Sequence, residues 1–242
     1  MHNYIANATW QIQSDKSYGS GFSFIKEDIV VTNHHVIEPS QLNPLIPIFG
    51  YTEDRLKVEL ELVDFSPKEK NDWAILRIKG KLPENRIVLA PESAPKYDRG
   101  QRIIFSGFPH GISHLLTNEA HISGKIDNEK FYINGMINGG NSGGPIINAD
   151  TGKVIGIITQ RRFLGFELQK TLNEIKRLQN YCEQLKKGSG GVNIMGIDFV
   201  GFAGLISSSL DVVSKVVVVN ANSGIGIGFS IENVASKIKA IL

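Results

Sequence analysis

The chain has 242 residues, of which 41% are hydrophobic, so it can bury the core of one large domain or of two smaller ones. Its formal net charge of +2 is too close to neutral to favour binding to nucleic acid or to an anionic membrane. Because Cys182 is the only cysteine, no intrachain disulfide can form.

A cytoplasmic location is predicted from two features of the sequence. The first residues, MHNYIANATW, lack both the basic region and the long apolar core of a signal peptide. The single cysteine gives no sign of an oxidising compartment. The apolar run at residues 200–206 is too short to cross a bilayer, so we expect no membrane contact.

Strand patterns follow one another through residues 1–81, which we interpret as a first β-barrel. Short apolar or alternating segments are separated there by turn residues. Pro39, Pro44 and Pro47 interrupt the pattern, and we expect an irregular connection around them. The predicted strands are residues 8–13, 19–25, 29–31, 57–65 and 72–78.

Prolines and charges dominate residues 82–100, which we interpret as a linker between two barrels. Strand patterns resume in residues 101–162, the first part of the predicted second barrel. The predicted strands in this part are residues 102–106, 115–126, 130–133, 145–148 and 154–160.

A helical insertion into the second barrel is predicted at residues 163–214. From residue 166 to 187, apolar side chains recur three or four apart with charges between them, as in an amphipathic helix. A second helix at residues 198–213 is expected to fold back on the first. Residues 215–242 are then expected to complete the barrel, with strands at 215–220 and 226–231 and a short helix from residue 232.

Four glycines surround Ser142 in the segment Asn138-Gly-Gly-Asn-Ser-Gly-Gly-Pro145. Glycine allows positive φ and lets a substrate carbonyl approach backbone N–H groups closely. A serine that attacks a carbonyl creates an oxyanion, which such donors stabilise. The N–H groups of Gly140 and Ser142 are the expected donors. A polar hairpin between two strands is the alternative interpretation of the same pattern.

A serine nucleophile needs an adjacent base, and that base is oriented by a third group. The sequence contains residue types for both roles. His34 and His35 follow one apolar strand, and Asp72 precedes another. Acyl transfer by these groups requires neither a metal nor a cofactor, and we expect none.

Three segments resemble the motifs of trypsin-like serine peptidases. They are Thr32-Asn-His-His-Val36 for the histidine, Asp72-Trp-Ala-Ile-Leu76 for the aspartate and Gly140-Asn-Ser-Gly-Gly-Pro145 for the nucleophile, in the order of chymotrypsin. A more specific resemblance, to Deg/HtrA peptidases, rests on Gly19-Ser-Gly-Phe22, Gly107-Phe-Pro-His-Gly111 and Gly224-Ile-Gly-Ile-Gly-Phe-Ser-Ile231. It implies a mainly β fold of two antiparallel barrels. We find no PDZ-like module after the second barrel in this sequence, so the resemblance covers the peptidase domain only.

The resemblance also implies roles for individual residues. His35, which precedes valine, matches the general base, Asp72 matches the residue that orients it, and Ser142 matches the nucleophile. The other histidines, His34, His110, His114 and His121, are expected to be structural. The oxyanion hole is expected at Gly140, Asn141 and Ser142.

The resemblance places the primary specificity pocket as well. Its floor is expected at Met136 and Ile137, and its walls at Thr159, Gln160, Arg161 and Ile227. None of these residues carries a carboxylate that would bind a substrate lysine or arginine. We therefore expect a polypeptide substrate with a small or medium apolar residue before the scissile bond.

Alternatives remain open at this point. A binding module without enzymatic activity could use the same fold, and an esterase could use the same three residues. The helix at residues 166–187 could dock a regulatory protein or a second copy of the chain. Alternatively, its apolar stripe could be covered by residues 198–213.

Overall fold

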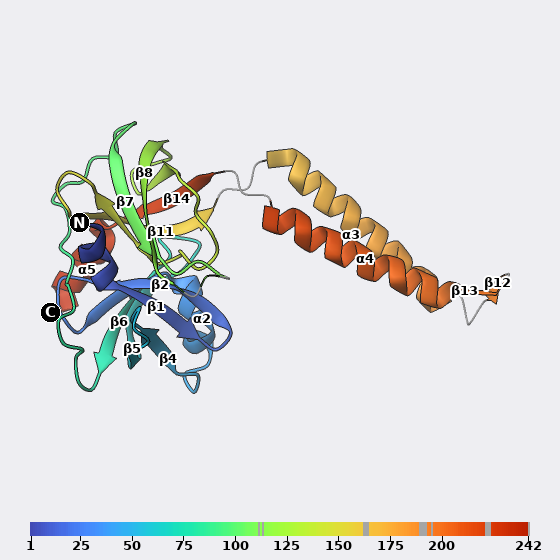
Figure 1. Cartoon of the computed structure of the whole chain (residues 1–242), viewed down its shortest axis with the longest axis horizontal. Coiled ribbons are helices and arrows are strands. Elements are labelled where there is room, and N and C mark those ends of the chain that lie inside the picture. The colour runs from blue at the N-terminus through green and yellow to red at the C-terminus, as the bar shows by residue number, and fades with distance from the viewer. Residues whose placement is uncertain are drawn as a thin grey trace. The chain divides into compact units, whose positions relative to one another are not determined.

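The computed structural model describes residues 1–110, 112, 114–161, 165–188, 193–194, 196–220 and 224–241. The chain divides into two compact units, one formed by Met1–Arg162 and Gly224–Leu242 and the other by Phe163–Ser223. In the described residues the first unit contains two closed β-barrels and the second two long helices, whose arrangement within each unit can be followed in Figure 1.

The first barrel closes in the order β1-β2-β3-β6-β5-β4, with every neighbouring pair antiparallel. Closure leaves no strand edge to be paired by another chain. Along the strands, buried residues alternate with exposed ones or form fully buried runs. The strands are β1 Thr9–Ser14, β2 Ser17–Ser23, β3 Ile29–Thr32, β4 Ile48–Tyr51, β5 Lys57–Ser66 and β6 Trp73–Lys79.

The second barrel closes in the order β10-β11-β14-β9-β8-β7, again with antiparallel neighbours. The helical unit interrupts the chain between β11 and β14, which are paired neighbours in the barrel. The strands are β7 Arg102–Gly107, β8 Leu116–Lys125, β9 Lys130–Asn134, β10 Pro145–Asn148, β11 Val154–Arg161 and β14 Ile225–Ser230.

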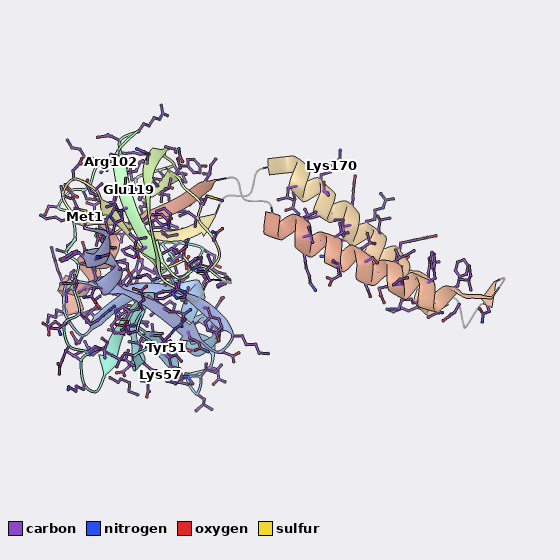
Figure 2. All side chains as sticks on the ribbon, viewed as in Figure 1. Met1, Tyr51, Lys57, Arg102, Glu119 and Lys170 are labelled. Carbon is purple, nitrogen blue, oxygen red and sulfur yellow. The ribbon has the colours of Figure 1, made fainter. Side chains whose placement is uncertain are left out.

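The two barrels share one buried cluster. Phe24 and Ile75 from the first barrel meet Ile104 and Ile157 from the second, and Leu89 of the linker lies in the same cluster. The linker is fixed elsewhere by the hydroxyl of Tyr97, which donates to Ile155 O at 3.0 Å and contacts Ser230 Oγ at 2.8 Å. Burial raises the pKa of this hydroxyl to about 12. Charged pairs at the surface, such as Arg102 with Glu119 (Figure 2), contribute little by comparison.

The connection expected to be irregular around the three prolines contains two regular elements. Helix α2, His34–Leu42, includes Pro39, and β4 follows at Ile48. Val36 and Ile37 of α2 are buried, and Ser40 N–H donates to Ser14 Oγ at 3.1 Å. Tertiary packing therefore overrides the local signal of the prolines, and the prediction was wrong here.

Two further helices belong to this unit. Helix α1, His2–Ala8, was not predicted, and it buries Ile5 in the cluster shared by the barrels. Helix α5, Glu232–Ile241, ends the described chain and buries Val234, Ala235 and Ile238. The predicted fold class, two antiparallel barrels with a helical insertion in the second and a short C-terminal helix, is confirmed.

The second unit is a helical hairpin. Helix α3, Gly165–Gly188, lies beside α4, Phe199–Asn220, and the short strands β12 (Asn193–Ile194) and β13 (Ile197–Asp198) lie between them in the chain (Figure 1). Ile175 and Cys182 of α3 and Ala203 of α4 are buried. The apolar stripe of α3 is therefore covered by α4 only in part, because Leu178, which belongs to the stripe, is 52% exposed.

Helix α4 differs from its prediction in length. Residues 215–220, expected to form a strand, continue the helix, and Lys215 pairs with Asp211 one turn earlier at 2.5 Å. Its residues Phe199–Val217 are long and apolar enough to cross a membrane, judged by length and composition. The prediction that the apolar segment is too short was based on residues 200–206 alone and was wrong.

Candidate active site

His35 and Asp72 form a hydrogen-bonded pair at one rim of the first barrel. His35 lies at the start of α2 and Asp72 immediately before β6. His35 Nδ1 lies 2.7 Å from Asp72 Oδ2, and the His35 N–H donates to Asp72 Oδ1 at 3.1 Å. Asp72 has only 1% of its side chain exposed, whereas His35 has 31% exposed and can contact a substrate. The carboxylate thus fixes both the ring and the backbone of His35.

The backbone of Asp72 adopts a conformation that few residues accept. Its φ is +46°, in the left-handed region, where aspartate and asparagine are better tolerated than most residues. The Asn33 side-chain amide donates to Asp72 O at 2.6 Å, and Asp72 N–H donates to Pro67 O at 3.1 Å. These bonds stabilise the turn that aims the carboxylate at His35.

Thr159 links this pair to the second barrel. Its hydroxyl donates to Asp72 Oδ2 at 2.5 Å, and its side chain is buried. Thr159 occupies a β-bulge, because the register between β11 and β14 shifts between Ile158 and Gln160. Bulges commonly redirect a side chain next to a functional site. Thr159, which we expected to line the substrate pocket, uses its hydroxyl to bind the carboxylate of Asp72.

Ser142 lies in the glycine-rich loop before β10 and is partly buried. Its hydroxyl donates to Thr159 O at 3.1 Å. Gly143, with φ of +88°, follows it, and a Cβ there would lie 2.1 Å from Ser20 O. Only glycine lets the loop approach the first barrel this closely.

The peptide groups before Ser142 are held from outside the loop. His110 N–H donates to Gly139 O at 2.7 Å, and the Ser20 hydroxyl donates to Gly140 O, also at 2.7 Å. Ser20 Oγ in turn accepts from Phe108 N–H at 2.9 Å. In the described part of the chain, the N–H groups of Gly140 and Ser142 have no acceptor, so both are free to bind an oxyanion.

One predicted oxyanion donor is engaged elsewhere. The Asn141 N–H donates to Asn138 O at 3.1 Å, closing a turn within the loop. The prediction that Asn141 contributes to the oxyanion hole is therefore not supported by its hydrogen bonding. Gly140 and Ser142 remain as the pair of free donors.

The residues expected to form the specificity pocket are only partly brought together. The Met136 side chain is 69% exposed, whereas Ile137 is 1% exposed and packs against Gly226, where a Cβ would lie 2.3 Å from Ile137 Cγ1. Ile227 is buried and pairs with Gln160 across β14 and β11, and Arg161 pairs with Gly226. Ile137 rather than Met136 is therefore the buried apolar residue at the expected floor.

Several residues near the site carried no functional assignment from the sequence. Ser20 was named only as part of the Gly19–Phe22 segment that resembles Deg/HtrA peptidases, and His110 was expected to be structural. The His110 ring lies against Gly139 and Gly140, and its Nε2 is 3.2 Å from Tyr18 O. His34 does behave as a core residue, because it is buried and stacks on Phe65 with ring centroids 4.7 Å apart. No candidate metal cluster of three or more His, Cys, Asp or Glu occurs among the described residues.

Replacing Ser20 with alanine is expected to lower kcat about 100-fold with little change in KM. The substitution removes the hydroxyl that holds Gly140 O and leaves the Phe108 N–H without its acceptor. Removing an oxyanion donor costs about 10²–10³ in kcat, and we expect the lower end of this range because Ser20→Ala releases Gly140 without removing its N–H. Steady-state kinetics on a peptide substrate measure the effect, and Ser17→Ala on the same strand is the control. Full activity of Ser20→Ala would refute this role.

Comparison with known proteins agrees with this geometry. The family model for the trypsin-like peptidase domain matches residues 19–157, more than half of the chain. A probable periplasmic serine endoprotease, DegP-like, from Pseudomonas fluorescens is 32% identical over 182 residues, which cover 72% of this chain and 36% of the relative. Serine protease HTRA1 from Xenopus laevis is 28% identical over 171 residues, which cover 66% of this chain and 35% of the relative. The chain thus spans about a third of the length of these relatives.

Solved structures show the same fold. Deg5 has 25% sequence identity and a TM-score of 0.56, with 65% of this chain and 81% of Deg5 covered. Rv3671c from M. tuberculosis has 23% identity and a TM-score of 0.53, with 66% of this chain and 78% of Rv3671c covered. This second likeness supports the fold alone.

The predicted cytoplasmic location is contradicted by these relatives, several of which are named periplasmic. The prediction relied on Cys182, but a single cysteine cannot form an intrachain disulfide in any compartment and so does not discriminate between compartments. The predicted resemblance, in contrast, is confirmed, and the relatives' names agree with the predicted class of enzyme. The chain belongs to the trypsin-like peptidase family and is related to the DegP and HTRA1 serine endoproteases.

Proposed function

We propose that this chain is a serine endopeptidase in which Ser142, His35 and Asp72 form a catalytic triad. The proposal rests chiefly on the 2.7 Å contact between His35 Nδ1 and the buried carboxylate of Asp72. That contact assigns the Nδ1–H tautomer to His35 and leaves Nε2 able to accept a proton. The glycine-rich loop around Ser142 supports the same assignment.

The reaction begins when the Ser142 hydroxyl turns from Thr159 O toward His35 Nε2. As Ser142 Oγ bonds to the substrate carbonyl carbon, its proton moves to Nε2, and Asp72 stabilises the imidazolium. The C–N bond then breaks, and His35 gives the proton to the leaving amine. Water then attacks the acyl-enzyme and gives a proton to His35 Nε2. His35 passes this proton to Ser142 Oγ as the acyl group leaves.

The developing oxyanion is assigned to the N–H groups of Gly140 and Ser142. Their acceptor-free state supports this role. The bond from His110 N–H to Gly139 O fixes the peptide group that carries the Gly140 N–H, and the bond from Gly144 N–H to Asn141 O fixes the one that carries the Ser142 N–H. Donors that are already oriented lose little energy to reorganisation during the reaction. The first barrel thus supplies the base and the second supplies the nucleophile and the oxyanion site.

A small or medium apolar residue is proposed before the scissile bond. Ile137 and Ile227 are buried apolar residues at the expected pocket, and neither position carries a carboxylate. Profiling on a mixed peptide library should therefore give cleavage after valine, alanine or leucine. Dominant cleavage after lysine or arginine would overturn this preference without affecting the triad.

A fluorophosphonate probe tests the proposed chemistry directly. It should label the folded wild-type chain at Ser142, and peptide mapping should locate the adduct there. A folded chain that stays unlabelled would favour the binding module instead. Comparing amide and ester substrates separates a peptidase from an esterase that uses the same residues.

Two features of the wider protein belong to the proposal as well. The relatives' names support a periplasmic location. Regulation through the helical insertion would have to use the part of α3 that α4 leaves exposed, such as Leu178.

A further inference from the structure

Helix α4 exposes an unusual amount of apolar surface. Only 6% of its Phe199–Val217 stretch is buried. Seven of its large apolar residues are between 37% and 64% exposed. These residues, which we call the apolar flank, are Phe199, Phe202, Leu205, Ile206, Val212, Val213 and Val216. A continuous exposed patch of this kind is typical of an interaction surface.

Packing against α3 does not account for this composition. The α4 residues that are buried or half-buried against α3 recur three and four apart, as in an antiparallel coiled coil. Two of them are serines, and Ser207 Oγ lies 3.4 Å from Glu183 Oε1. The set is Val200, Ala203, Gly204, Ser207, Leu210, Ser214 and Val217. Apart from Leu210, the Leu, Ile and Phe side chains of α4 therefore lie outside the hairpin, where water would surround them.

The exposed residues share one side of the hairpin. At 3.6 residues per turn, the apolar flank lies to one side of the α3 contact, whereas Ser208, Asp211 and Lys215 lie to the other. Asp211 and Lys215 pair with each other, so neither charge faces the apolar flank. In an antiparallel pair, the corresponding side of α3 carries Leu178 and Tyr181, which are 52% and 61% exposed.

Basic residues border this surface on α3. Leu178 and Tyr181 line a groove together with Arg177 and Glu174. Lys170, labelled on α3 in Figure 2, is exposed and lies seven residues before Arg177. Seven residues are about two helical turns, so both side chains lie on the same side of α3. Over its whole length α3 has five basic residues, Lys170, Lys176, Arg177, Lys186 and Lys187, and three acidic ones, Glu167, Glu174 and Glu183. An apolar surface bordered by Lys and Arg is typical of a helix that lies in a membrane interface.

The path of the chain excludes a membrane-spanning α4. The hairpin leaves the second barrel after β11 and returns to it at β14. If α4 crossed a bilayer, α3 would have to cross it too, and the eight charged residues of α3 would enter the hydrocarbon. Such charges are strongly unfavourable at the bilayer centre.

We propose that the hairpin binds in the plane of a lipid bilayer, with the apolar flank of α4 at the boundary between headgroups and acyl chains. Arg177 and Lys170 would then lie at the level of the lipid phosphates. A second copy of the hairpin explains the surface less well. Leu205 and Val212, 64% and 59% exposed, face almost directly away from α3, so a flat protein partner on the flank would leave them in water. Lipid surrounds the whole exposed side of the helix.

The full chain should co-sediment with phosphatidylcholine vesicles that contain phosphatidylglycerol, and less with phosphatidylcholine alone. Changing Leu205→Glu together with Val213→Glu should lower the vesicle-bound to free ratio at least about tenfold, because two charges enter the apolar flank. Gln169→Glu adds an acidic charge to the exposed side of α3 that lies away from the apolar flank, and it should leave binding unchanged. Thermal unfolding of all three proteins checks that the hairpin stays folded.

If the double variant unfolds, a fluorophore provides the second measurement. Attached at Leu205→Cys in a Cys182→Ser background, it should brighten and shift to the blue with vesicles, whereas at Gln169→Cys it should not. Wild-type protein that stays in the supernatant with both vesicle types overturns the proposal. So does a dimer that the double variant abolishes without any vesicle binding, which would identify a second copy as the partner. Resistance to alkaline carbonate extraction would indicate a span and overturn the in-plane arrangement.

Discussion

Replacing Ser142 with alanine is expected to lower kcat about 10⁶-fold, the largest effect of any single change in this chain. Without the hydroxyl there is no group to form the acyl-enzyme, and only the oxyanion donors and substrate binding would still act. The glycines around residue 142 are unchanged, so the loop should keep its shape. Burst kinetics and peptide turnover measure the loss, and Ser93→Ala, an exposed serine in the linker, is the matched control.

The same experiment distinguishes a triad from independent contributions. His35→Ala alone should cost about as much as Ser142→Ala, and the double variant should be no worse than either single one, because the residues act as a unit. Additive losses in the double variant would contradict the assigned roles. Activity of Ser142→Ala within tenfold of wild type would exclude Ser142 as the nucleophile.

The sequence predicted most of the fold because its strand signals are local. Alternating segments such as β5 and the hairpin of β1 and β2 carry their own period and turn residues. Helix α2 was missed because Pro39 is a strong local breaker, whereas the packing of Val36 and Ile37 is visible only in three dimensions. The end of α4 was missed because a run of valines suits a strand equally well.

The candidate site was predictable to the extent that it lies in motifs. Ser142, His35 and Asp72 each stand in a short recognisable segment, but the residues that position them do not. Thr159 acts through a bulge between β11 and β14, and a register shift leaves no mark in the sequence. Ser20 contacts the nucleophile loop across more than a hundred residues, and its N–H donates to Ser142 O at 2.7 Å. Such contacts follow from the closure of two barrels against each other.

These contacts also show how the site depends on the whole first unit. Ser20 lies on β2 of the first barrel and holds the oxyanion loop of the second. Thr159 lies on β11 of the second barrel and holds the carboxylate of the first. Each barrel therefore holds, by a hydrogen bond, a group of the candidate site that the other barrel carries. Loosening the barrel interface should impair catalysis before it unfolds either barrel.

Changing Asp72→Asn is expected to lower kcat about 10⁴-fold while the chain stays folded. Asparagine also accepts a φ of +46°, so the turn held by Asn33 can persist. The carboxylate accepts from the His35 ring, the His35 N–H and the Thr159 hydroxyl, and an amide has only one oxygen to offer them. If its NH₂ group faces the ring, His35 must carry its proton on Nε2 and cannot take one from Ser142.

Thr159→Val and Asp64→Asn are the variants with which the loss of kcat in Asp72→Asn is compared. Thr159→Val removes one hydrogen bond from the Asp72 carboxylate, which stays charged. We therefore expect kcat to fall only about tenfold. Asp64 lies on β5 of the same barrel and pairs with Lys237 at 3.4 Å, and its amide should leave kcat unchanged. Measuring kcat, KM and thermal unfolding for the three variants separates tautomer control from stability. A loss at Asp72→Asn no larger than that at Thr159→Val would show that the carboxylate does not orient the base.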